Sequence, residues 1–258
     1  MLAKTRCLPG FAPTAPVARN HALDLDVAGW RITGQVEKIF VTTVAGAAQW
    51  QLLRAFPARR GELKAESELS FRDRVPLFLD WALLRLHTAC TPGAEVPAVR
   101  LRALVADEEP RWQAGINAWD EHFMAAPPGA RAPLLADLER RVGQLLSWWQ
   151  EAQTAPRWYF PKAAWATLKA ELYSKPIKPN ADGVAEVQAK APAVSVGQVW
   201  VAAHAGGGER SYAPGYSQLL AGDVDFADGT PELVALHAFA QQLHACISLD
   251  ARPAEGTP

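Results

Sequence analysis

The strongest constraint on the fold is a run of alternating apolar and polar residues that follows His21. Its apolar members are Leu23, Leu25, Val27, Trp30, Ile32 and Gly34, and the polar members between them are Asp24, Asp26, Arg31 and Thr33. A period of two residues is typical of half-buried strands, and Ala28-Gly29 interrupts it where a tight turn would fall. The sequence therefore predicts a β-hairpin and, after a loop with Gly46, a third strand over residues 49–56.

Two pieces of these strands resemble the metal-binding strands of a restriction-nuclease-like core of the PD-(D/E)xK type. In such a core an acid follows a glycine on one strand, and a second acid and a lysine lie two residues apart on the next. The acids hold a divalent cation that activates water, and the lysine offsets phosphate charge. Here Gly34 is followed by Glu37, but Arg54 stands where the second acid would be and Phe56 where the lysine would be. An arginine cannot ligate a cation, so this site is expected to hold no metal and to be catalytically inactive.

Composition limits the other classes of function. The chain has 258 residues, is 49% hydrophobic and carries a formal net charge of −1, which fits a globular protein without a global basic field. Its three cysteines are far apart and form no zinc, iron–sulfur or disulfide pattern. No apolar run approaches the roughly 20 residues of a membrane span, and no signal-peptide pattern stands at the N-terminus. We therefore expect a cytoplasmic protein that binds no cofactor.

A cluster of cations follows the third strand. A rim built by Arg54, Arg59, Arg60 and Lys64 could contact DNA phosphates. Acids are interleaved with these cations, and a solvated loop of mixed charge is the favoured interpretation. A helix should follow, capped by Asp73, with Pro76 in its first turn and an end before Thr91.

The rest of the chain alternates between strand and helix patterns. A strand is predicted over residues 99–105, then a short helix that carries Trp112, Ile116, Trp119 and Phe123. The strongest helix pattern spans residues 133–153, followed by a short strand over residues 157–160, a helix from Lys162 to about Leu172 and a last helix from Leu233 to Ile247. Pro127-Pro128-Gly129 separates the short helix from the helix over residues 133–153.

Other candidate sites are weak. The glycine run Gly206-Gly207-Gly208 lacks the following Lys-Ser/Thr of a phosphate-binding loop. The histidines are scattered, and His237 and His244 are expected at a surface or edge of one helix rather than as ligands; the full set is His21, His87, His122, His204, His237 and His244. Ten tryptophans could stack bases, but Trp112, Trp119, Trp149 and Trp165 lie at positions that a core also requires, and core is the better interpretation for most of them.

The order of these segments resembles the C-terminal domain of the exodeoxyribonuclease V gamma subunit, the RecC family. The strongest single match is the segment PRWYFPKAAW at residues 156–165. The other matching segments lie at residues 25–36, 50–54, 77–86, 99–104, 138–152 and 200–220. The resemblance implies a mixed α/β (α+β) fold with a nuclease-like core, a central mixed sheet flanked by helices, and no catalytic residues.

The resemblance also implies a role. The family domain serves as scaffold in a helicase–nuclease that processes double-strand breaks for recombination, holds the complex together and helps to separate the strands at the duplex junction. Its partners would be RecB-like beta and RecD-like alpha subunits and forked DNA. Large helicase-like domains precede this one in the full-length subunit, and recognition of a regulatory DNA sequence is not carried over to this chain.

The expected domain organisation follows the same segments. Residues 1–20 form a tail or the remnant of a preceding domain, residues 21–172 the nuclease-like core, and residues 173–193 an exposed connection. Residues 194–250 are the C-terminal helical part of the same domain, and residues 251–258 a disordered tail. Two alternatives stay open: an active metal-dependent nuclease that combines Glu37 with Asp24 or Asp26, and an α+β protein-interaction module unrelated to DNA.

Overall fold

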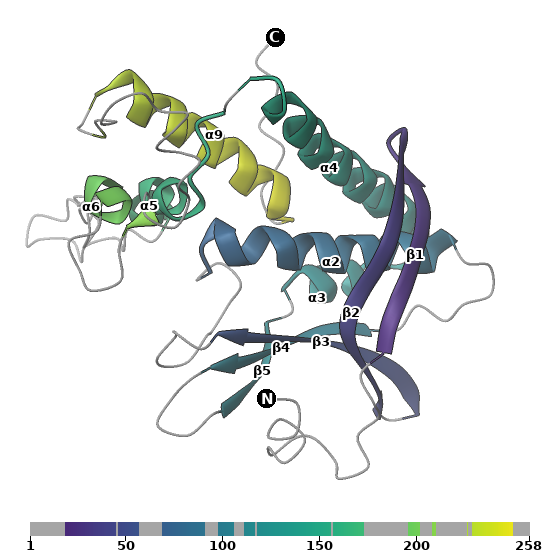
Figure 1. Ribbon diagram of the computed structural model, residues 1–258. Helices are drawn as coiled ribbons and strands as arrows, with labels where there is room; N and C mark the ends of the chain where they lie inside the picture. Colours follow the sequence, from purple (N-terminus) through teal and green to yellow (C-terminus); the bar gives the residue numbers. More distant parts are fainter. Residues whose placement is uncertain are drawn as a thin grey trace, which may run out of the picture. The chain divides into compact units, whose positions relative to one another are not determined.

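The computed structural model describes residues 19–44, 46–56, 69–90, 98–105, 111–116, 118–155, 157–172, 196–201, 208–209, 226 and 229–249. The strands are β1 (Arg19–Val27), β2 (Trp30–Val44), β3 (Ala47–Phe56), β4 (Ala98–Val105) and β5 (Arg111–Ile116). The helices are α2 (Phe71–Cys90), α3 (Ala118–Ala125), the 3₁₀ turn η2 (Pro128–Ala130), α4 (Arg131–Ala152), α5 (Pro161–Leu172), α6 (Val196–Val201) and α9 (Pro231–Ile247). Figure 1 shows these elements.

The chain divides into two compact units. The first comprises residues 1–69 and 74–146, and the second comprises residues 70–73 and 147–258. The predicted N-terminal tail, connection and C-terminal tail lie outside the described residues, except that Arg19 and Asn20 already belong to β1. The predicted domain bounds therefore stay predictions.

The first unit contains a mixed five-stranded sheet in the order β1-β2-β3-β4-β5. Only the pair β3–β4 is parallel, and the other neighbours are antiparallel. Parallel neighbours need a crossover rather than a tight turn, and α2 lies in the chain between these two strands. The protein is therefore a mixed α/β protein, as expected (Figure 1).

The predicted hairpin is confirmed. Val27 pairs with Trp30, and the two residues between them, Ala28 and Gly29, have φ values of 49° and 82°. Two positive φ angles are what a two-residue type I′ turn requires, because its twist matches that of the flanking strands. The odd-numbered apolar residues of β1, Leu23, Leu25 and Val27, are buried, so the period-two pattern marks the core face correctly.

The tip of the hairpin is fixed to α4. The Ala28 amide donates a 2.9 Å hydrogen bond to Oε1 of Glu139. One turn later, a Cβ added to Gly143 would lie 2.5 Å from the Ala28 Cβ. Only a glycine allows this approach, which explains a glycine in the middle of an otherwise strong helix.

Helix α2 begins earlier than the sequence predicts. It starts at Phe71, so Asp73 lies inside the helix and Pro76 in its second turn, and the predicted Asp73 cap is wrong. The Asp73 amide instead donates to the Ser70 carbonyl, and the Ser70 hydroxyl contacts Asp73 Oδ2 at 3.5 Å. Phe71 is fully buried, and this burial outweighs the local signal of the acid. The predicted end before Thr91 is confirmed.

The segment after β4 corrects a second prediction. Residues 111–116 form strand β5 rather than the first half of a helix, and only Trp119 and Phe123 of the predicted set belong to α3. The residues Trp112, Ala114 and Ile116 also alternate with period two, and pairing with β4 makes that pattern the effective one. Tertiary pairing therefore decided an ambiguous local pattern.

The aromatic core of the first unit joins α2 to α3. Phe78 and Trp81 of α2 lie 5.4 and 6.0 Å from the ring of Trp119, which is buried as predicted. Helix α4 matches its prediction within two residues, but Trp149 near its end is 59% exposed, so its assignment to the core is wrong.

The second unit is built around α5 and α9. Helix α5 contacts both α6 and α9. The buried Phe160 ring lies 4.4 Å from Trp200 of α6 and 5.9 Å from Phe226, and Trp165 stacks on His244 of α9. The burial of Trp165 confirms the core prediction, and His244 lies half-buried at the helix edge.

The predicted strand at residues 157–160 is wrong. These residues adopt no regular secondary structure, and the Tyr159 amide instead bonds to the Arg157 carbonyl at 2.8 Å. Their alternating large side chains enter separate aromatic contacts: Trp158 with Phe160, and Tyr159 with Phe239. A row of aromatic residues resembles a strand, yet here side-chain packing replaces strand pairing.

None of the described helices is apolar enough over a sufficient length to pass through a membrane.

Candidate functional site

Glu37, the first of the predicted degenerate nuclease positions, lies on the exposed face of β2. Gly34 has a φ of 151°, and the Glu37 side chain is exposed three residues later. The Glu37 carboxylate accepts a 3.3 Å hydrogen bond from the Gln35 amide, and Asn20 of β1 donates to Gln35 at 3.4 Å. Glu37 therefore belongs to a polar ladder along the outer face of the hairpin.

The second strand of the motif parts from the first at this place. The pairs between β2 and β3 run from Val44↔Ala47 to Ile39↔Leu52, while β3 continues beside β4 as far as Phe56. Glu37 and Arg54 each lie two residues beyond the last β2–β3 pair, on separate strands. The predicted positions thus flank the point where the two strands separate.

The predicted cations follow β3 or lie at its end. Arg54 and Phe56 occupy β3 opposite Ala103 and Val105 of β4, but their side chains lie outside the described residues. Arg59, Arg60 and Lys64 lie outside them altogether. The phosphate-contacting rim stays a prediction.

The carboxylates of the active-nuclease alternative do not come together. Asp24 pairs in register with Thr33, four residues before Glu37 on the same face of β2, which separates the two acids by about 13 Å. Asp24 is instead held by Arg31, whose Nε and Nη2 each donate to a carboxylate oxygen at 3.1 Å. These hydrogen bonds and the nearby charge hold the pKa of Asp24 below its usual value. Among the described residues, no three His, Cys, Asp or Glu side chains gather as a metal would require.

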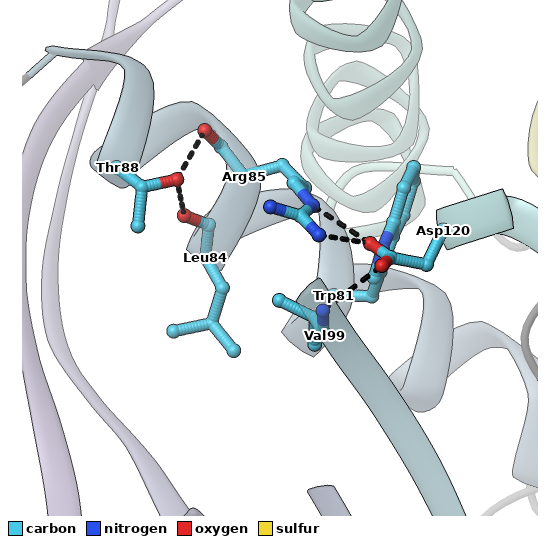
Figure 2. A network of polar contacts seen from close by, with 6 residues as sticks. All are labelled: Trp81, Leu84, Arg85, Thr88, Val99 and Asp120. Atoms are coloured by element: carbon cyan, nitrogen blue, oxygen red, sulfur yellow. Dashed lines mark hydrogen bonds and ion pairs between the residues drawn. The ribbon is translucent and has the colours of Figure 1, made fainter. Parts of the chain in front are cut away.

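A buried polar network lies where α2, α3 and β4 meet (Figure 2). Asp120 Oδ1 accepts hydrogen bonds from Trp81 Nε1 at 2.9 Å and from Arg85 Nε at 2.8 Å, and also from Arg85 Nη2. Its other oxygen accepts the Val99 amide at 2.9 Å. Both oxygens of the carboxylate are engaged by donors, so the network joins three elements and has a structural role.

The Arg85 guanidinium is fully buried and lies 5.2 Å from the Phe123 ring centroid. Burial lowers its pKa, while the charge of Asp120 acts in the opposite direction. Arginine keeps its proton even so, because the guanidinium is the most basic of the ionisable side chains. No spacing rule in the sequence predicts this pair. The available signal was an arginine one turn after Trp81, on a helix face otherwise made of large apolar residues.

The second unit contains a buried carboxylate with a comparable task. Glu209 accepts the backbone amides of Lys162 and Ala163 at 3.0 and 2.9 Å. These are among the first amides of α5, which have no partner within the helix, and a carboxylate suits the positive end of the helix dipole. Burial raises the pKa of Glu209, and the two amides oppose that effect. Glu209 therefore caps the start of α5. The sequence predicted instead that a strand at residues 157–160 leads into this helix.

A comparison with known protein families identifies the family of this chain. A family model for the RecC C-terminal domain matches residues 8–172. The match takes in well over half of the chain, including the sheet, the Arg85–Asp120 network and α5. The chain belongs to the RecC C-terminal domain family. This confirms the resemblance drawn from the order of sequence segments and connects the chain with the gamma subunit of RecBCD-type enzymes. No curated protein sequence matches it.

Glu209 lies outside the segment that matches the RecC family. The family match ends at Leu172, the last residue of α5. The residue that caps the start of α5 comes from the part of the chain beyond that match. The second unit of this RecC family member therefore combines matched and unmatched segments in one core.

Proposed function

We propose that the chain is a noncatalytic DNA-binding and assembly domain of a RecBCD-type helicase–nuclease, the exodeoxyribonuclease V complex. It acts in the repair of double-strand breaks by homologous recombination. Its partners in the cytoplasm are a RecB-like beta subunit, a RecD-like alpha subunit and forked or double-stranded DNA. The observation that carries this proposal is the family match over residues 8–172.

The proposal of a nuclease-like core without catalysis is supported by the strands β2 and β3. The acid of the first strand is kept as Glu37, while Arg54 and Phe56 replace the second acid and the lysine. A single carboxylate beside an arginine is a poor ligand set for Mg²⁺, which is bound through several oxygens. The chain on this proposal binds no metal or other cofactor.

The charge of the hairpin supports the place proposed for DNA contact. Its exposed face carries the acids Asp24, Asp26 and Glu37 against Arg31. Such a face repels phosphates, because backbone charge dominates affinity for DNA. The proposed contact is therefore the rim of Arg54, Arg59, Arg60 and Lys64, which follows β3 in the chain.

The rim is tested by the salt dependence of binding to a labelled forked duplex. Replacing Arg59, Arg60 and Lys64 together by Gln removes up to three phosphate contacts, so the slope of log affinity against log salt should decrease by up to about 3. A charge-matched control replaces Arg31, Arg140 and Lys169, which are exposed elsewhere in the chain.

The proposal requires the rim variant to lose affinity and slope while the control variant keeps both. Equal losses in the two variants would mean that net charge, rather than the rim, governs binding. Binding of the unmodified chain that does not respond to salt would exclude phosphate contact as its basis.

A further inference from the structure

Two histidines that are 66 residues apart in the sequence meet in the first unit. His21 Nε2 of β1 lies 2.9 Å from His87 Nδ1 in the last turn of α2. The rings are nearly perpendicular, with centroids 4.8 Å apart. This distance fits an N–H···N hydrogen bond in which one neutral ring donates and the other accepts.

The contact lies where β1 has few other restraints. β1 is at the end of the strand order, so it has a neighbouring strand on one side. Its register with β2 shifts between Arg19 and His21, directly beside the histidine. The start of an edge strand with irregular pairing depends more than the strand centre on contacts with other elements.

The described charged side chains near the pair are already engaged by other groups. Both rings are half-buried, and the uncharged Trp50 ring of β3 lies 4.8 Å from His21. The charge of His87 acts on the Asp24 carboxylate of β1, which already accepts hydrogen bonds from Arg31 of β2. On α2, the titratable residues within one turn of His87 are Arg85, which donates to Asp120, and the exposed Cys90.

We propose that the His21–His87 contact is a proton-controlled clasp that holds the start of β1 against the end of α2 at neutral pH and releases it in acid. When both rings are protonated, each nitrogen at the contact becomes a donor and no acceptor is left. The two positive charges then lie within 5 Å of each other, and the hydrogen bond is replaced by repulsion.

The direction of the pH effect follows from His21. Burial lowers the pKa of His21, and the charge of His87 lowers it further. A histidine with a lowered pKa in the folded chain stabilises the fold above its ordinary pKa, and this contribution is lost as the pH falls through that value. The clasp is therefore closed at neutral pH and opens as the pH falls below about 6.5.

Amide hydrogen exchange on the full chain between pH 5 and 8 tests the clasp, after correction for the intrinsic pH dependence of exchange. Amides of residues 20–23 in β1 should lose about tenfold or more of their protection in acid. Amides of residues 236–243 in α9 should keep theirs and serve as an internal reference. His21→Gln keeps a polar side chain but cannot titrate, so its β1 protection should be independent of pH.

His122→Gln, which removes an exposed imidazole from α3, should behave like the unmodified chain. The proposal is overturned if β1 keeps its protection in acid, or if His21→Gln loses it to the same extent. Nitrogen-15 NMR of the unmodified chain provides a second test that needs no variant. Protonation of the His21 ring should accompany the loss of protection in β1, and protonation that leaves this protection unchanged would contradict the clasp.

Discussion

Two Arg–Asp pairs in the first unit have the same chemistry and opposite environments. The Arg31–Asp24 pair on the hairpin is 71% and 63% exposed, whereas the Arg85–Asp120 pair between α2, α3 and β4 is 0% and 6% exposed. An exposed pair is screened by water and contributes little to stability, but a buried charge without its partner is costly. The junction of α2, α3 and β4 therefore depends on its ion pair, whereas the outer face of the hairpin can change without loss of the fold.

The largest expected effect comes from breaking the buried pair. Asp120→Ala leaves the Arg85 guanidinium, the Trp81 indole and the Val99 amide without the carboxylate, and should destabilise the chain by about 3–5 kcal/mol. Chemical denaturation followed by circular dichroism measures the change. Asp120→Asn, which keeps the shape and one acceptor oxygen, should lose less. A loss below about 1 kcal/mol in Asp120→Ala would show that the network is dispensable.

A second variant tests the contact between the tip of the hairpin and α4. Gly143→Ala places a methyl group against the Ala28 Cβ and should cost about 1–3 kcal/mol, because the neighbouring backbone must move. Ala28→Gly removes the opposing methyl group and suits the positive φ at that position. In the Ala28→Gly background, Gly143→Ala should therefore cost much less. Equal costs in both backgrounds would exclude this contact as the reason for the glycine.

The buried carboxylate of the second unit should show an intermediate effect. Glu209→Ala leaves the Lys162 and Ala163 amides without their acceptor and should cost about 1–2 kcal/mol at neutral pH.

Glu209 should also leave a signature in the pH dependence of stability. Because burial raises the pKa of Glu209, the pH-dependent part of its contribution to stability is full below the ordinary glutamate pKa and is lost as the pH rises through the raised value, while the two amide hydrogen bonds remain. Glu209→Gln should remove this part of the pH dependence, which denaturation midpoints between pH 4 and 8 would detect. An unchanged profile in Glu209→Gln would assign the dependence to other groups.

The smallest effect is expected on the outer face of the hairpin. Arg31→Ala and Asp24→Asn break a bidentate ion pair, yet both variants should unfold at the same denaturant concentration as the unmodified chain within error. A clear loss of stability in either variant would remove the contrast between the two pairs.

The parts of the fold that the sequence predicts well are those with a strong local signal. The alternation around Ala28-Gly29 predicts the hairpin and its buried face, and the apolar spacing of α4 and α9 predicts both helices. The order of segments predicts the family. In each case the pattern is repeated over several turns or residues, so that a single competing contact does not reverse it.

The parts that the sequence does not predict depend on contacts between distant segments. Trp112 and Ile116 fit a helix and a strand equally, and pairing with β4 decides for the strand. Asp120 meets Arg85 from 35 residues away, and His21 meets His87 from 66 residues away. No spacing rule joins such residues, which explains why the histidines look scattered in the sequence.

The predicted DNA-contacting cations, Arg59, Arg60 and Lys64, stay predictions because they fall outside the described residues. Glu37 and Arg54 were correctly placed on neighbouring strands, but the place where these strands separate could not be inferred from the sequence.

The proposed noncatalytic DNA-binding role is tested by a native gel of a labelled forked duplex incubated with the purified chain. Parallel lanes contain Mg²⁺, Mn²⁺ or a chelator, and a denaturing gel of the same samples reports strand cleavage. Retarded and intact DNA is expected in every lane, because Arg54 and Phe56 occupy the positions where the proposed nuclease-like core would need an acid and a lysine. Cleavage that requires a metal ion, and that is lost in Glu37→Ala, would contradict it.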